Sequence, residues 1–167
     1  MINLVKEFME VYGQLPNIMG AEETFNLRLS LIQEEAAELI EAKNDIEELD
    51  ALVDLAYVIY GSYLAFGIPS ADPEHLIFGE SSRQAIFDVA MGIESETVDS
   101  DLDEILMLVT TLAEKYNFEG AFQEVHRSNM SKLNSEGKPV KRHDGKILKG
   151  PNYSPPNLAP FVQKNFA

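Results

Sequence analysis

Residues 46–61 read IEELDALVDLAYVIYG, and this stretch decides how the chain folds. At about 100° per residue, Glu47 and Asp54 project about 20° apart around a helix, and Asp50 lies within about 60° of either. After Asp54, no charged residue follows until Asp72. An ionised carboxylate so deep in an apolar run is unfavourable unless a positive group neutralises it. The stretch therefore predicts a buried helix that carries an acidic stripe.

A second acidic cluster precedes this helix, in residues 31–42, LIQEEAAELIEA, where Glu34, Glu35 and Glu38 fall close together. Two facing helices with such clusters would surround a hard divalent cation with oxygen ligands. All-carboxylate ligation favours Mg²⁺, with Mn²⁺ as the alternative, over zinc. No histidine has a glutamate three residues before it, which argues against a ferritin-like di-iron site.

The same carboxylates also have a purely structural interpretation. A run of glutamates on a helix usually forms a solvated face. A buried Asp54 would then cap a loop or pair with Arg28 or Lys43. Other catalytic patterns are missing from the sequence, which has no cysteine nucleophile, no G-x-S-x-G turn, no P-loop and no Rossmann glycine fingerprint. His126 is interpreted as a surface residue at the end of a helix.

The composition predicts one globular domain. A chain of 167 residues with 45% hydrophobic and 25% charged residues is long enough to bury a core. The absence of cysteine fits a reducing cytoplasm, and the N-terminal residues lack the pattern of a secretory signal. We therefore expect a cytoplasmic protein. The uncharged residues 55–71 are shorter than the roughly 20 residues of a membrane span, so they predict a buried core helix.

The net charge of −15 argues against non-specific nucleic-acid binding. The charge is unevenly distributed, because residues 127–150 hold seven basic and two acidic side chains, whereas residues 1–126 hold five basic and 26 acidic ones. An acidic body with one basic segment suits a small anionic ligand that arrives with a metal ion. A solvated basic loop is the structural alternative.

Helical spacing of apolar residues predicts an all-α bundle of about five to six helices. The expected helices cover approximately residues 3–12, 22–43, 46–66, 81–92, 100–116 and 119–127. A capping box of Ser100 with Asp103 is expected to start the fifth helix.

From residue 134 onward, glycine, proline, lysine and asparagine replace helix formers. Asp144-Gly145 predicts the turn of a short β-hairpin, and the proline-rich residues after it predict an extended chain. We therefore divide the chain into an all-α bundle, residues 1–133, and a C-terminal arm, residues 134–167. The arm is expected to pack on the bundle or on a neighbouring subunit.

Two stretches together carry a family resemblance. The first is LIQEEAAELIEA followed by ALVDLAYVIYG. The second is FQEVHRSNMSKL followed by GKPVKRHDGKILKGPNYSPPNL. The pair resembles the MazG-like, all-α nucleoside triphosphate pyrophosphohydrolases, a group that includes phosphoribosyl-ATP pyrophosphohydrolase and the dimeric dUTPases. The resemblance covers roughly residues 22–66 and 119–158.

The resemblance implies that Mg²⁺ is held by a Glu-x-x-Glu motif on one helix and a Glu-x-x-Asp motif on the next. The first motif maps onto Glu35 and Glu38. The second departs from the pattern, because its glutamate position falls on Ala51 when Asp54 takes the aspartate position. Either Asp50 substitutes from one residue earlier, which is the assignment favoured here, or Glu47 and Asp50 fill the motif.

The resemblance also implies a reaction, in which water cuts a nucleoside triphosphate between its α and β phosphates. By position, Glu34 or Glu35 would hold or deprotonate that water. The residues expected to contact phosphate or sugar, or to close over the substrate, are Asn129, Lys132, Arg142 and Lys149. A homodimer or homotetramer is implied, with no nucleic-acid or membrane partner. The alternative is a non-catalytic nucleotide-binding or helical interaction protein on the same fold.

Overall fold

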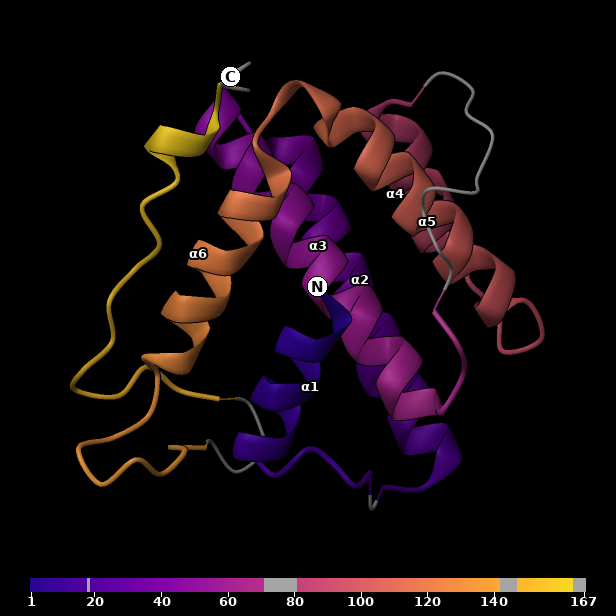
Figure 1. Ribbon diagram of the computed structural model, residues 1–167. Helices are drawn as coiled ribbons and strands as arrows, with labels where there is room; N and C mark the ends of the chain where they lie inside the picture. Colours follow the sequence, from indigo (N-terminus) through magenta and orange to yellow (C-terminus); the bar gives the residue numbers. More distant parts are fainter. Residues whose placement is uncertain (18, 71–80, 142–146, 164–167) are drawn as a thin grey trace.

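The computed structural model describes residues 1–17, 19–70, 81–141 and 147–163. Within these residues the protein is all-α, with six α-helices, two short 3₁₀ helices and no strand (Figure 1). The α-helices are α1 (Ile2–Val11), α2 (Ala21–Glu41), α3 (Asp45–Phe66), α4 (Arg83–Met91), α5 (Val98–Leu112) and α6 (Phe118–Met130); the 3₁₀ helices are η2 (Ala113–Lys115) and η3 (Ala159–Phe161). The all-α prediction is confirmed.

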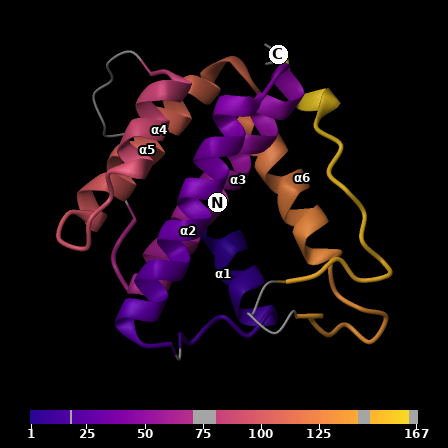
Figure 2. The ribbon, with the colours of Figure 1, turned by 180° about the vertical axis from the view of Figure 1, so that it is seen from behind.

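Helix α3 forms the centre of the bundle. Its length and composition alone would suffice to cross a membrane, but 67% of its most apolar window is buried inside the protein. Helix α2 packs along it, α1 and α6 cover one side, and α5 covers the other (Figures 1 and 2). The stretch predicted to be a buried core helix is therefore the core of this chain's own bundle.

Local sequence fixes the ends of α3. The Asn44 side chain accepts hydrogen bonds from the backbone N–H groups of Ile46 (3.1 Å) and Glu47 (3.0 Å), which would otherwise lack partners. At the other end, Gly67 adopts a left-handed conformation with φ of 70°, where a side chain would be strained. The helix therefore starts and stops where these two residues allow.

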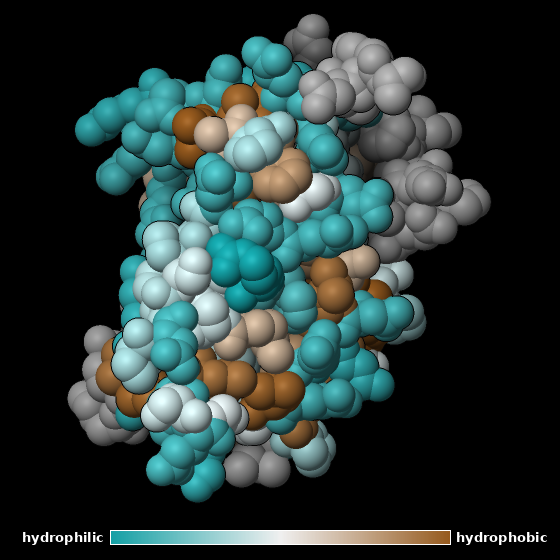
Figure 3. Space-filling view, turned by 60° about the vertical axis from the view of Figure 1, so that its left-hand side comes forward, coloured by the Kyte–Doolittle hydropathy of each residue, from teal (hydrophilic) through white to brown (hydrophobic). Residues whose placement is uncertain are grey.

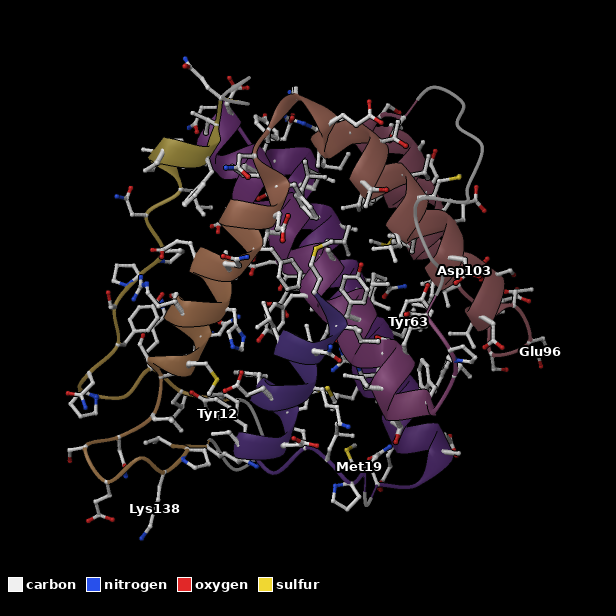
Figure 4. The ribbon with its side chains drawn as sticks, in the orientation of Figure 1. Tyr12, Met19, Tyr63, Glu96, Asp103 and Lys138 are labelled. Carbon is white, nitrogen blue, oxygen red and sulfur yellow. The ribbon has the colours of Figure 1, made fainter. Side chains whose placement is uncertain are left out.

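Polar contacts tie α3 to its neighbours. The buried Glu48 carboxylate accepts hydrogen bonds from Arg83 and, at 2.9 Å, from the Tyr116 hydroxyl, and it lies 2.5 Å from the Lys115 ammonium. Further along α3, the Tyr63 hydroxyl donates to Asp103 of α5 at 2.6 Å, and the two side chains point toward one another in Figure 4. These contacts hold the α4–α5 side of the bundle against α3.

Two helix ends differ from the expected ones. Helix α5 begins at Val98 rather than near residue 100, and the Ser100 hydroxyl donates to the backbone oxygen of Thr97 inside the first turn, so the predicted capping box is wrong. Helix α6 continues to Met130 instead of ending near Arg127, since nothing in the following residues breaks a helix. The longer α6 places Asn129 on the helix.

The described part of the C-terminal segment runs along α6. The backbone N–H of Asn157 donates to Glu124 at 2.8 Å, and that of Ser154 donates to the Ser131 hydroxyl at 2.9 Å. This side of the molecule is largely hydrophilic, with smaller hydrophobic patches between (Figure 3). The Asp144-Gly145 turn lies outside the described residues, and in the described chain on either side of it an antiparallel bridge pairs Lys141 with Ile147. The division at residue 133 stays a prediction.

Candidate active site

The antiparallel pairing of α2 and α3 brings the two acidic clusters together. Burial raises the pKa of Glu35 from 4.5 to about 8, and repulsion from other carboxylates adds to the rise. The contributing carboxylates, strongest first, are Asp54, Glu38, Glu34 and Asp50. All four predicted metal-binding residues, Glu35, Glu38, Asp50 and Asp54, thus share one electrostatic site.

Asp54 lies at the middle of this site. Burial raises its pKa from 3.8 to about 7, and repulsion from Asp50 and Glu38 adds to that rise. The nearby Lys132 ammonium acts in the opposite direction. Burial also raises the pKa of Asp50. The seam between α2 and α3 therefore concentrates negative charge that its own surroundings do not fully neutralise.

Of the structural alternatives for these carboxylates, the pairing of Asp54 with Arg28 is wrong, whereas a solvated face agrees with the exposed Glu34, Glu38 and Glu41. Arg28 turns away from Asp54, because its guanidinium donates to the backbone oxygen of Val58 at 2.5 Å and to the Ser62 hydroxyl at 3.0 Å. Glu47 instead closes the α2–α3 connection, accepting from the Lys43 backbone N–H at 2.7 Å and from the Asn44 amide at 2.8 Å.

Helix α6 contributes a cation and an amide to the same site. Lys132 follows the end of α6, and its ammonium donates to the Asn129 side-chain oxygen at 2.7 Å. The positive charge of the same ammonium lowers the pKa of Asp54. The two residues lie more than seventy positions beyond Asp54 in the sequence. The structure thus brings two of the four predicted substrate residues to the carboxylates.

Of the other two predicted substrate residues, the structure describes only Lys149. Arg142 lies outside the described residues. Lys149 is exposed, and its ammonium stands 4.6 Å from the centre of the Tyr153 ring. No interaction in the described part of the chain joins Lys149 to the carboxylates.

The interpretation of His126 as a surface residue was wrong. It is 9% exposed, and its Nδ1 lies 2.9 Å from the Tyr57 hydroxyl. The same hydroxyl hydrogen bonds to the Asn129 side chain. Sequence reasoning missed this pairing, although the three-residue spacing of His126 and Asn129 along one helix face was a usable indication.

A pocket of about 280 Å³ adjoins the carboxylates at the open end of the α2–α3 seam. Its lining comes from the end of α2 and the start of α3, and consists of Glu38, Glu41, Ala42, Lys43, Glu47, Asp50 and Ala51. The site is thus accessible to a small molecule on its Glu38 and Asp50 side.

The donors fit a hard divalent cation in their chemistry. Glu35 Oε2 is buried and has no hydrogen-bond partner among the described residues, which is costly for a carboxylate oxygen. The neighbouring oxygens are also carboxylate oxygens, the ligands that Mg²⁺ prefers. In the described residues no three such side chains converge tightly enough to hold an ion as they stand, so ligation would require them to turn toward one point.

Residues 5–77 match the family model of phosphoribosyl-ATP pyrophosphohydrolase. This chain belongs to that MazG-like family. The match includes both acidic helices of the pyrophosphohydrolase domain and stops before α6, so Asn129 and Lys132 lie beyond it.

An uncharacterized protein of Acanthamoeba polyphaga mimivirus, L479, is 30% identical to this chain over an alignment of 174 residues. The alignment covers 77% of this chain and 69% of the viral protein. No solved structure gives a significant match. The family assignment therefore rests on sequence, and the all-α bundle described above agrees with it.

Proposed function

We propose that this protein is a Mg²⁺-dependent nucleoside triphosphate pyrophosphohydrolase, releasing a nucleoside monophosphate and pyrophosphate. The observation that carries the proposal is the meeting of two kinds of charge. The carboxylates of α2 and α3 lie near Lys132, which follows α6 and whose positive charge lowers the pKa of Asp54. A triphosphate with its metal ion needs both kinds of group, whereas a purely structural acidic helix needs neither.

The proposed ligands of Mg²⁺, with Mn²⁺ as the alternative, are Glu35, Glu38, Asp50 and Asp54. The ion would neutralise phosphate charge and lower the pKa of a bound water. Glu47 is excluded from this set because its carboxylate caps the α2–α3 connection. These contacts of Glu47 support the assignment of the second motif to Asp50 with Asp54.

The remaining groups are assigned to phosphate binding and proton transfer. Lys132 and Asn129 would bind phosphate oxygens, and Arg142 and Lys149 remain candidates to close over the substrate. The attacking water passes its proton to Glu35 or to the adjacent, exposed Glu34 as the bond between the α and β phosphates breaks. The Glu35 pKa of about 8 belongs to the metal-free site, where that carboxyl is mostly protonated at neutral pH; a bound cation would displace the proton and leave the carboxylate able to act.

Pyrophosphate release from a panel of ribo- and deoxyribonucleoside triphosphates, in Mg²⁺ and in EDTA, tests the proposal. We expect metal-dependent release, with at least a roughly 100-fold loss of kcat/KM in Asp54→Asn and in Glu38→Gln. Glu47→Gln is the matched control, because it removes a carboxylate of the same α3 stripe that is already used in capping. Equal rates in Asp54→Asn and the unmutated protein would refute the metal-site assignment.

A second candidate is a nucleotide-binding protein without turnover. It is favoured because the carboxylates of the described residues do not converge on one point where they could hold a metal ion. It predicts thermal stabilisation by nucleotide with Mg²⁺ but no pyrophosphate release. We also propose self-association, as the family implies, to be checked by sedimentation. The apolar face of α3 is not its basis, because that face is buried within the chain.

A further inference from the structure

His126 is a buried polar side chain that the proposed reaction does not use. Its ring stacks on the Tyr57 ring, with centroids 6.2 Å apart and an interplanar angle of 25°. Its Nδ1 lies 2.9 Å from the Tyr57 hydroxyl, and its Nε2 lies 3.4 Å from a carboxylate oxygen of Glu7 on α1. Both ring nitrogens therefore have partners on other helices.

A series of hydrogen bonds links His126 to the candidate site, and its donors and acceptors follow one order from Lys132 to Glu7. Lys132 can only donate, so the Asn129 oxygen accepts from it at 2.7 Å. The Asn129 amide nitrogen is then left to donate to the Tyr57 oxygen. The Tyr57 hydroxyl in turn donates to His126 Nδ1, and His126 Nε2–H faces Glu7, which only accepts. Each contact in the series therefore has one donor and one acceptor.

We propose that His126 is a positioning residue, which acts through Tyr57 and Asn129 to hold the Lys132 ammonium facing Asp54. The mechanical reason lies in the side chain, because the Lys132 backbone is already held: its N–H donates to the Asn129 backbone oxygen and its backbone oxygen accepts from the Gly150 N–H, both at 3.2 Å. The ammonium is a flexible group on a long stem. A fixed acceptor at Asn129 restricts it, and Asn129 is fixed by Tyr57 only while Tyr57 has His126 to donate to.

The α6 backbone is anchored independently of this series. The hydroxyl of Tyr12, the residue that follows α1, donates to the Asn129 backbone oxygen at 2.8 Å. Phe122 of α6 stacks on Tyr57, with ring centroids 5.4 Å apart. Replacing His126 with phenylalanine therefore keeps an aromatic ring and the helix anchor, and removes both ring nitrogens.

The consequence for phosphate binding rests on the proposed function, whereas the position of Lys132 is measurable without it. The variants are His126→Phe, Tyr57→Phe and the double variant, with His126→Asn as the conservative replacement, since its side-chain oxygen stands near the place of Nδ1. Tyr63→Phe is the matched control, because it removes another α3 hydroxyl whose hydrogen bond goes to α5 instead.

The first readout is the rate at which an amine-specific reagent labels Lys132, normalised to the exposed Lys138 and followed by mass spectrometry. We expect labelling of Lys132 to rise several-fold in His126→Phe and in Tyr57→Phe, and to stay unchanged in Tyr63→Phe and near the unmutated rate in His126→Asn. Unchanged labelling in folded His126→Phe and Tyr57→Phe proteins would overturn the inference.

The second readout is kcat/KM for pyrophosphate release. A partner that orients a functional group typically contributes 10- to 100-fold, so each single variant should lose about tenfold. The double variant should lose no more than the larger single loss, because both substitutions interrupt one series. A roughly 100-fold, multiplicative loss in the double variant would contradict action through Tyr57. If the unmutated protein releases no pyrophosphate while labelling still responds, the proposed function fails and the positioning role stands.

Discussion

The raised pKa of Glu35 predicts how the stability of the metal-free protein depends on pH. Its pKa is about 8 in the folded protein, against 4.5 ordinarily. Between these values the folded protein holds a proton that the unfolded chain has released. Raising the pH through this range therefore lowers the free energy of unfolding.

The size of the effect follows from the pKa. One pKa unit corresponds to about 1.4 kcal/mol, so the full rise from 4.5 to about 8 amounts to about 4 to 5 kcal/mol. Glu35 is partly exposed, and solvent screens part of this repulsion. Between about pH 5.5 and pH 8.5, the free energy of unfolding should fall in both proteins. We expect the fall to be about 2 to 3 kcal/mol smaller in Glu35→Gln than in the unmutated protein.

Urea denaturation in EDTA at several pH values measures this difference. Glu34→Gln is the matched control, because Glu34 is the adjacent, exposed carboxylate of the same helix. Its pH dependence should follow that of the unmutated protein. Added Mg²⁺ should stabilise the unmutated protein at pH 8.5 more than it stabilises Glu35→Gln. If the free energy of unfolding depends on pH in the same way in Glu35→Gln and in the unmutated protein, Glu35 does not have the raised pKa assigned to it.

Two further substitutions test the frame around the site. Glu48→Gln should lower the free energy of unfolding by about 3 kcal/mol, because it leaves Arg83 and its neighbours without the buried carboxylate. As a control, replacing the exposed Asp45 with asparagine should lower it by less than about 1 kcal/mol in the same urea titration. Equal effects of the two substitutions would contradict the difference in burial. Gly150→Ala would place a Cβ 2.8 Å from the Lys132 backbone oxygen, so a shift of that segment should reduce kcat/KM by at least about tenfold. An unchanged kcat/KM would show that Lys132 tolerates the displacement.

Local sequence was sufficient for the helices and for the acidic seam. The 3.6-residue period and the caps are properties of neighbouring residues, so the spacing of Glu47, Asp50 and Asp54 could be read directly. The errors fell at helix ends. Ser100 was expected to cap a helix that begins at Val98, and α6 extends to Met130, because several cap positions in each stretch were locally acceptable.

The tertiary structure decided which polar groups meet. Glu47 and Asp50 looked equivalent in the sequence, but only the α2–α3 connection shows that Glu47 is used as a cap. Tyr57 and His126 are 69 residues apart in the sequence, and their contact exists because α6 packs against α3. A helical period specifies which face of a helix is apolar, whereas the partner of a buried polar atom depends on the packing of another helix. The carboxylates could therefore be found from the sequence, while the series from Glu7 to Lys132 that faces them could not.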